Sequence, residues 1–339
     1  MIVRVGTQAI CNIVTGNDNI LGVVWAKWCQ DQSFMLWNKL LVMSQNGIII
    51  LKSVLTEIER SHSEESNQHF ELGYIIINEI FKFGYFVNAM NILKGTDSAI
   101  IVNQHQTILV KLLDSTLYKH PEIKIPFTDN DFDYMTRLLC ELSKEAIRVI
   151  EHAVVTHRDK LSNIELDDVS LVYTCLVLLF QIVNVFITTS LTNYNQPMKS
   201  FLNKYNAMSI IIELLSHCEK MVDWNDKEKS KLGFNYLKRE IVKCIGSLCY
   251  KDKANQDLVR ECGGLPLILN QMKIDESNPY IREHAVVSLR HILENNIENQ
   301  GLISEMKPIE AIQSTELDEM GLQATLIDGK VQVKNKDKK

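Results

Sequence analysis

The sequence is poor in the residues that separate short strands. Its 339 residues include only 14 glycines and six prolines. A sandwich or barrel of many short strands needs more turn residues than that. Apolar residues make up 46% of the chain, so a large core can be buried. Scarce turn residues and long apolar stretches together predict an all-α protein.

Common catalytic motifs are also missing. The sequence contains no GxGxxG, GxxxxGKS/T, GxSxG or HExxH motif, which removes the usual signatures of phosphate loops, serine hydrolases and zinc proteases. The paired carboxylates Glu64 and Glu65 lie in a polar stretch, where neither burial nor a close charge would tune them as acids. We therefore predict that the protein is not an enzyme and has no catalytic residues and no cofactor.

The chain has no strongly basic composition. Its formal net charge is −6, whereas dedicated nucleic-acid binders carry clustered positive charge. The lysine-rich residues 331–339 are the exception, and we interpret them as a solvated, disordered end. We therefore expect no nucleic-acid partner.

Neither a secretion signal nor a disulfide pattern is visible. Residues 1–6 are not followed by a sustained apolar core or a small-residue cleavage site, as a signal peptide would require. The cysteines form no CxxC pair and mostly lie among apolar residues, where free cysteine behaves as a small hydrophobe. We therefore expect a reducing, cytoplasmic location. The eight cysteines are Cys11, Cys29, Cys140, Cys175, Cys218, Cys244, Cys249 and Cys262.

One apolar segment, residues 171–187, reaches the lower edge of a membrane-spanning length. Gln181 and Asn184 interrupt it, and no cluster of lysine and arginine flanks it to set an orientation. Central helices of a repeat protein are covered on several sides, so their sequences are also apolar all round. We interpret the segment as a buried helix and expect no membrane insertion.

Helices are best defined near the C-terminus. Residues 238–250 carry apolar positions at helical spacing. Gly263 and Gly264 can end the next short helix, and Pro266 suits the first turn of the one after. Asn278 is predicted to cap a further helix. The predicted inward positions of that helix are Ile281, Ala285, Val286, Leu289, Ile292 and Leu293.

These pieces repeat along the chain. The pair Arg239 and Glu240 recurs 43 positions later as Arg282 and Glu283, and Asn255-Gln256 recurs 44 positions later as Asn299-Gln300. An all-helical period of roughly 40–47 residues is typical of armadillo and HEAT repeats, whose units stack because none can bury its own apolar stripe. We therefore predict an all-α, armadillo/HEAT-like right-handed α-solenoid.

The same pattern organises the rest of the chain. Further helices are expected over residues 48–58, 72–93 with bends at Gly73 and Gly84, 100–117, 135–153 and 206–218. Loops are expected over residues 61–69, 119–133, 192–200 and 219–231. We predict one repeat domain over residues 1–312 and a tail over residues 313–339, with a short ordered segment before its disordered end.

The beginning of the chain resembles a third copy of the repeat, over residues 4–21. The chain would then open inside a repeat, with no capping unit to cover its apolar surface. Two explanations stay open: this end is stabilised in some other way, or the sequence is truncated.

Three runs of residues carry a resemblance to a known family. They are LKREIVKCIGSLCY at 237–250, NQDLVRECGGLPLIL at 255–269 and NPYIREHA at 278–285. Together they resemble the conserved C-terminal domain of the ataxin-10 family, most specifically over residues 233–303. The asparagine-rich middle is similar to fungal members, one branch of which carries a copper-transport name.

The resemblance implies an armadillo-like fold, a cytoplasmic protein and a role in cytokinesis or cell division. The family has no catalytic residues to carry over. The main prediction is therefore a non-enzymatic interaction scaffold for a protein partner of unknown identity. A peptide- or cargo-binding adaptor of another pathway is an alternative, and a homo-oligomer stays open.

A role in copper homeostasis, direct or indirect, is the other alternative. Cu(I) favours the sulfur of cysteine and methionine. Cys244 and Cys249 are five positions apart, which places them roughly 140° apart around a helix, and Cys262 could approach them. His284 and His291 could share a helix face, whereas the neighbouring His217 and Cys218 would diverge. Two such ligands do not make a site, so we predict no metal site.

A few polar and aromatic residues are candidates for partner contact. Arg282, Glu283 and Asn299 lie at the repeat joints, where they would either hydrogen-bond helix ends or hold a partner. A tryptophan cluster near the start lacks the regular Trp/Asn ladder of nuclear-import armadillo proteins, so we expect it to pack in the first repeat. Its members are Trp25, Trp28 and Trp37. The partner-binding residues stay unknown.

Overall fold

A computed structural model describes residues 45–61, 68–94, 101–119, 124–156, 163–188, 194–220, 236–306, 317, 319–327 and 330–335. The described chain is helical apart from one hairpin, so the predicted all-α class is confirmed. The helices are α4 (Gln45–Ser61), α5 (Gln68–Lys82), α6 (Phe86–Lys94), α7 (Gln104–Lys119), α8 (Asp129–Thr156), α9 (Asn163–Thr188), α10 (Asn195–Lys204), α11 (Ala207–Lys220), α12 (Leu237–Cys249), α13 (Lys253–Glu261), α14 (Gly264–Asn270), α15 (Ile281–Leu293) and α16 (Ile297–Glu305).

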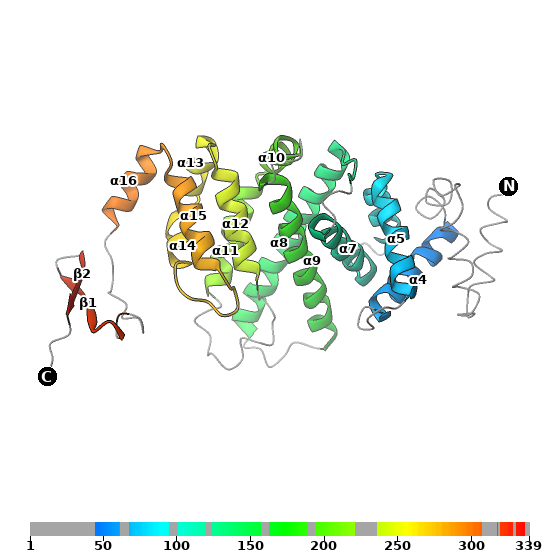
Figure 1. Ribbon diagram of the computed structural model, residues 1–339, viewed down its shortest axis with the longest axis horizontal. Helices are drawn as coiled ribbons and strands as arrows, with labels where there is room; N and C mark the ends of the chain where they lie inside the picture. The colour runs from blue at the N-terminus through cyan, green and yellow to red at the C-terminus, as the bar shows by residue number, and fades with distance from the viewer. Residues whose placement is uncertain are drawn as a thin grey trace.

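The helices lie side by side along the longest axis of the molecule, from α4 and α5 at one end to α16 near the other (Figure 1). One row contains α4, α7, α9, α12 and α15, each in contact with the next. Helices α8, α11 and α14 lie against this row and also contact one another in order. A single apolar core runs between the rows from Ile50 to Ile292. The armadillo/HEAT-like right-handed α-solenoid stays a prediction.

The last two repeats share one backbone design. Helices α12 and α15 have 13 residues each, α13 and α16 have nine each, and both pairs are offset by 44 positions. Left-handed residues recur at the same offset: Tyr236 (φ 68°) with Tyr280 (φ 64°), and Lys251 (φ 52°) with Asn295 (φ 56°). The period seen in the sequence is therefore a 44-residue structural repeat.

The N-caps of the short helices repeat as well. The Asp252 side chain accepts a hydrogen bond from the Asn255 N–H at 3.1 Å, and the Asn296 side chain accepts one from the Asn299 N–H at 3.1 Å. Each cap satisfies one of the backbone donors that a helix start leaves free. Gly263 is left-handed (φ 71°) between α13 and α14, as its predicted role as a helix stop requires.

Asn278 does not cap its own helix. The left-handed Tyr280 intervenes, and α15 begins at Ile281. Asn278 Oδ1 instead accepts a hydrogen bond from the Arg239 N–H (3.2 Å) in the first turn of α12. The residue therefore ties one repeat to the one before it.

Helix α9 is the apolar segment identified in the sequence. Over Val169–Thr188 it is long and apolar enough to cross a membrane, by length and composition. Its contacts are those of a core helix, because α7, α8, α10 and α12 all lie against it. In its second half, the side chains of Leu179, Phe180, Val183 and Phe186 are almost fully buried.

All four predicted loops contain helical residues, and two of them overlap a helix by several residues. Residues 119–133 were expected to be a loop, but α8 begins at Asp129. Asp131 stabilises this start, because its carboxylate accepts hydrogen bonds from the Thr128 N–H (2.8 Å) and hydroxyl (2.6 Å). Residues 192–200 were also expected to be a loop, but α10 begins at Asn195.

One of the two predicted bends is confirmed. The chain turns between α5 and α6 at Gly84, which is left-handed (φ 72°). Gly73 lies inside α5 without ending it. A Cβ at Gly73 would lie 2.7 Å from Ile58 Cγ1, so this glycine allows α4 and α5 to approach closely.

The tail contains a hairpin that the sequence analysis did not predict. Strand β1 (Leu322–Ile327) pairs antiparallel with β2 (Lys330–Asn335), with Leu322 opposite Asn335 and Ile327 opposite Lys330. The disordered end predicted from residue 331 is therefore wrong for the residues of β2, where valine alternates with polar residues as in a strand. In Figure 1 the hairpin lies beyond α16. Residues 1–44, with the third repeat copy and the three tryptophans, lie outside the described residues.

Candidate partner-binding surface

A charged cluster is buried in the middle of the helix row. Glu240 on α12 is almost fully buried. Its carboxylate accepts hydrogen bonds from Asn184 Nδ2 on α9 (3.0 Å), Lys243 Nζ (2.9 Å) and the Arg239 guanidinium (2.6 Å). Burial alone would raise the pKa of Glu240, but the hydrogen bonds and charges of Lys243 and Arg239 outweigh it and lower the pKa. The ionised Glu240 thus joins α9 to α12.

Asp114 on α7 lies within reach of this cluster. The pKa of Asp114 is raised to about 6, first by burial and second by the negative charge of Glu240, against the opposing positive charge of Lys243. Asn184 Oδ1 is buried without a hydrogen bond to any residue in the described chain. These groups lie between packed helices, so we interpret them as contacts that hold neighbouring helices together.

Asn299 was one of three candidate residues at the repeat joints, and it supports helix ends. It is fully buried. Its Nδ2 donates to the carbonyl oxygens of Ile292 (3.0 Å) and Gln256 (3.1 Å), and its Oδ1 accepts from Arg260 (2.7 Å). Of its two predicted roles, Asn299 therefore has the first: it hydrogen-bonds helix ends.

The other two candidates point to solvent. Arg282 and Glu283 lie in the first turn of α15, and their side chains are 55% and 57% exposed. Their nearest charged atoms are 3.8 Å apart, and an exposed pair of this kind contributes little to stability. Both side chains are available to a partner.

The surface around them is best understood by comparison with α12. There, Val242 is fully buried because α15 covers it. The Ser288 hydroxyl of α15 donates to the Val242 carbonyl (2.8 Å), and His291 Nδ1 lies 2.9 Å from the Gly246 carbonyl oxygen. This face of α12 is a helix-packing surface.

The equivalent face of α15 is open. Val286 corresponds to Val242 one repeat later, yet it is 54% exposed, and its neighbour Val287 is 51% exposed. The prediction that Val286 points inward was wrong, because α15 is the last helix of its row in the described chain. Arg290, also exposed, corresponds to Gly246. We define the end face as Arg282, Glu283, Val286, Val287 and Arg290.

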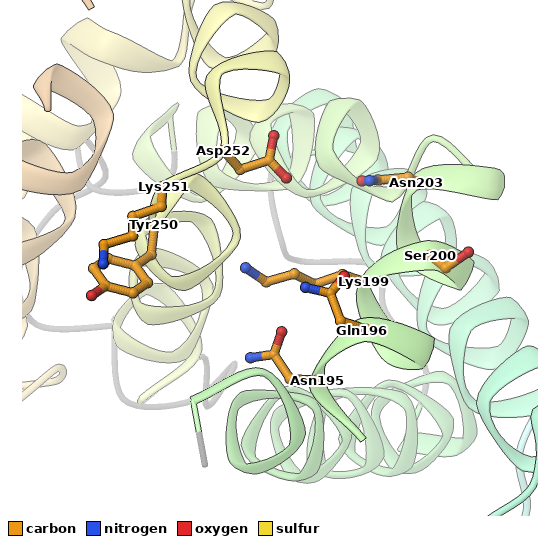
Figure 2. Close-up of a pocket in the computed structure, with 8 residues that line it drawn as sticks. All are labelled: Asn195, Gln196, Lys199, Ser200, Asn203, Tyr250, Lys251 and Asp252. Atoms are coloured by element: carbon orange, nitrogen blue, oxygen red, sulfur yellow. The ribbon is translucent and has the colours of Figure 1, made fainter. Parts of the chain in front are cut away.

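A second surface feature is a polar pocket of about 540 Å³ between α10 and the turn that precedes α13. In Figure 2 the Asn195 and Lys199 side chains extend from α10 toward that turn. The α10 residues share one helix face, at positions i, i+1, i+4, i+5 and i+8. The lining residues are Asn195, Gln196, Lys199, Ser200, Asn203, Tyr250, Lys251 and Asp252.

This pocket was not predicted from the sequence, because residues 192–200 were expected to form a loop. The signal that could have found the helix is the spacing of Met198 and Leu202, both of which are buried. The asparagine-rich composition hid that spacing. Lys199 is half-buried, and its ammonium has no hydrogen bond or ion pair with any described residue.

Comparison with known proteins shows which proteins this chain is similar to. A domain model described as the spinocerebellar ataxia type 10 protein domain matches residues 237–334. The ataxin-10 homolog of Schizosaccharomyces pombe is 27% identical over 98% of this chain and 83% of its own length. Ataxin-10 of Bos taurus is 22% identical over 94% of this chain and 68% of its own length.

The chain belongs to the ataxin-10 family. Other relatives match a short, more similar segment. The Dictyostelium discoideum ataxin-10 homolog is 40% identical over 33% of this chain, and that alignment spans 18% of its own length. The alignment with Xenopus tropicalis ataxin-10 spans 22% of the length of that protein. A solved engineered protein aligns with a TM-score of 0.19 at 13% identity, which supports no conclusion.

The ataxin-10 domain match covers α12 to α16 and the hairpin. The end face therefore lies wholly inside the matched domain. The pocket straddles its boundary, because α10 precedes the domain and Tyr250 to Asp252 belong to it.

The ligands considered for copper do not converge in the described chain. It contains no group of three or more histidine, cysteine, aspartate or glutamate side chains that could hold a metal ion. Cys244 and Cys249 are fully buried, and burial raises the pKa of Cys244 to about 12. Cys262 Sγ lies 3.4 Å from the Ser209 hydroxyl. A buried thiol with a raised pKa, such as that of Cys244, is a poor metal ligand.

Proposed function

We propose that this ataxin-10 family member is a non-enzymatic interaction scaffold that binds a protein partner through the end face of α15. The observation that carries the proposal is the exposure of Val286 and Val287 at positions where the preceding repeat buries or half-buries its residues. Two neighbouring exposed valines bordered by charged side chains have the composition of an interface with an apolar centre and a polar rim.

The end face also indicates what kind of surface it receives. Gly246 lets α15 approach α12 closely, and the arginine at position 290 would keep a further helix from packing on α15 in the same way. The partner is therefore expected to present apolar side chains to the two valines and a carboxylate to Arg290, since arginine pairs best with planar carboxylates.

The proposal is tested by affinity purification with quantitative mass spectrometry. The variant Val286→Asp places a charge in the centre of the end face. The control Ile49→Asp changes an aliphatic residue of nearly the same exposure, 52%, on α4 at the opposite end of the described stack. We expect the first variant to lose a specific protein that wild type and control both retain.

Two results would overturn the proposal. One is equal recovery of every co-purifying protein by Val286→Asp and wild type. The other is a dimer of this chain, seen by light scattering, that Val286→Asp dissociates, because a second copy would then cover the face. A captured protein supports the proposal only after it binds the purified chain directly.

We also propose that the scaffold acts in the cytoplasm during cytokinesis. Support comes from membership of the ataxin-10 family, together with the role that the sequence resemblance implies. Deletion of the gene should cause a division defect that wild type and Ile49→Asp correct and Val286→Asp does not. Normal division in the deletion strain would contradict this role while leaving the binding proposal to its own test.

A further inference from the structure

The polar pocket occupies a position that the next repeat fills with its own side chains. Helix α10 ends at Lys204, two residues before the left-handed Asn206, as α13 ends at Glu261, two residues before the left-handed Gly263. These two positions are 57 residues apart, and α11 and α14 start at the same offset. The joint between α10 and α13 can therefore be compared residue by residue with the joint between α13 and α16.

The later joint is closed by an amide. Gln256, which corresponds to Lys199, is 2% exposed. Its Nε2 donates to the carbonyl oxygens of His291 (2.9 Å) and Glu294 (3.3 Å) near the end of α15. Its Oε1 accepts a hydrogen bond from Asn296 Nδ2 (3.2 Å). Gln256 therefore closes this joint with hydrogen bonds made within the chain itself.

The later joint also neutralises its own lysine. Lys253 forms ion pairs with Asp257 (3.2 Å) and with Glu298 (3.1 Å). The corresponding positions in the earlier joint are Ser200 and Ala254. Both carboxylates are therefore missing from the joint that contains the pocket.

The earlier joint nevertheless carries two lysines. Lys199 extends toward the turn from α10, and Lys251 lies in the turn itself, with Nζ 5.2 Å from the ring centre of Tyr250. The one carboxylate that lines the pocket belongs to Asp252. Both of its oxygens already accept hydrogen bonds from Asn255, at 3.1 Å and 2.9 Å. The pocket thus has a net positive charge in a chain whose formal net charge is −6.

We infer that this pocket receives a carboxylate side chain from an acidic segment of the partner protein, an inference that rests on the proposed scaffold function. The guest carboxylate takes the part that Asp257 and Glu298 play in the next joint and pairs with Lys199 and Lys251. The amides of Gln196 and Asn203 offer further donors to the same segment.

Direct binding by the purified chain tests the inference without any knowledge of the partner. The probe is a fluorescein-labelled peptide in which glutamates alternate with glycine and serine, followed by fluorescence anisotropy. The matched peptide carries glutamine in place of glutamate. We expect the glutamate peptide to bind, the glutamine peptide not to bind, and affinity to fall as salt is raised.

The variants are chosen to fold. Lys199→Gln and Lys251→Asn introduce the residues that the later repeat carries at the equivalent positions, Gln256 and Asn295. Each should lower the affinity for the glutamate peptide about tenfold, the loss expected for one charge-assisted contact. Lys199→Arg keeps the charge and should bind nearly as wild type does. Lys144→Gln removes an exposed lysine of α8 and should change nothing.

Unchanged affinity in Lys199→Gln and Lys251→Asn, or equal binding of the two peptides, would overturn the inference. Displacement of the peptide by inorganic phosphate at constant ionic strength would also contradict a carboxylate-specific pocket. The end-face variant Val286→Asp should bind the peptide as wild type does. Loss of peptide binding at the pocket and loss of partner binding at the end face are therefore separate results.

Discussion

Gly246 of α12 and Ser288 of α15 lie in direct contact, and a Cβ on Gly246 would come within 2.7 Å of Ser288 Cα. The Ser288 hydroxyl donates to the Val242 carbonyl at the same crossing. The Ser288 hydroxyl and its Cβ (2.6 Å) would lie nearer still, and because Cβ and Cα are fixed to the backbone, rotation of the hydroxyl would not relieve the contact. This contact sets how closely the last two repeats pack.

The substitution Gly246→Ala is therefore expected to destabilise the fold. Overpacking of this kind costs about 1–3 kcal/mol, which outweighs the gain of about 1 kcal/mol in helix propensity. Urea unfolding measures the free energy. Gly301→Ala in α16 is the control, because a Cβ there meets nothing within 4 Å. A loss in the control as large as in Gly246→Ala would contradict the close approach.

Asp114→Asn is expected to stabilise the protein at neutral pH. The pKa of Asp114 is raised from 3.8 to about 6, so the folded state binds this proton more tightly than the unfolded state. Stability is therefore lost as pH rises from 3.8 to 6. The variant should gain about 1 kcal/mol at pH 7.5, after allowance for solvent screening.

The gain from Asp114→Asn should shrink toward zero near pH 4, where the wild-type carboxyl is protonated in the folded state. Urea unfolding at several pH values follows the difference between the two proteins. A gain independent of pH would show that ionised Asp114 carries no penalty. The exposed Glu213→Gln on α11 serves as control and should show little effect at any pH.

Glu240→Gln should destabilise the fold. The change leaves Arg239 and Lys243 without their buried carboxylate, and breaking such a pair costs about 3–5 kcal/mol. Because the folded pKa of Glu240 lies below 4.5, its contribution is present above that pH and is lost as pH falls through the folded pKa. Glu283→Gln, on the exposed turn of α15, should cost less than about 0.5 kcal/mol.

Alkylation should discriminate among the described cysteines. Cys262 is partly exposed, whereas Cys175, Cys218, Cys244 and Cys249 are buried, and burial raises the pKa of each of these four thiols. Peptide mapping after N-ethylmaleimide treatment of the native protein should find Cys262 labelled before those four. Stoichiometric copper in the same preparation, measured by elemental analysis, would instead support the copper alternative.

The sequence predicted what is encoded within one repeat. The Arg-Glu pairs, 43 positions apart, lie one position out of register with the 44-residue structural repeat. The period was visible because Asn255-Gln256 and Asn299-Gln300 occupy equivalent positions of α13 and α16, and because Gly263 marks a left-handed stop. Each of these features depends on local helix spacing and turn chemistry, so a single sequence carries it.

Features that depend on neighbours were missed. Val286 has the spacing of a core residue, and only the absence of a following helix in the described row exposes it. Asn278 precedes a proline as a helix cap does, yet its partner is Arg239 in the preceding repeat. The pocket requires both α10 and the turn at Lys251, which are far apart in the sequence. Such contacts exist only once the repeats are stacked.

The central claim is that the end face of α15 binds a protein partner. Its most direct test is the affinity of the purified partner, once identified by the purification described above, for wild type, Val286→Asp and Ile49→Asp, measured by isothermal titration calorimetry. A buried valine contributes about 1.5–3 kcal/mol, so Kd should rise about tenfold or more for Val286→Asp and stay unchanged for Ile49→Asp. Equal Kd values for all three proteins would contradict the claim.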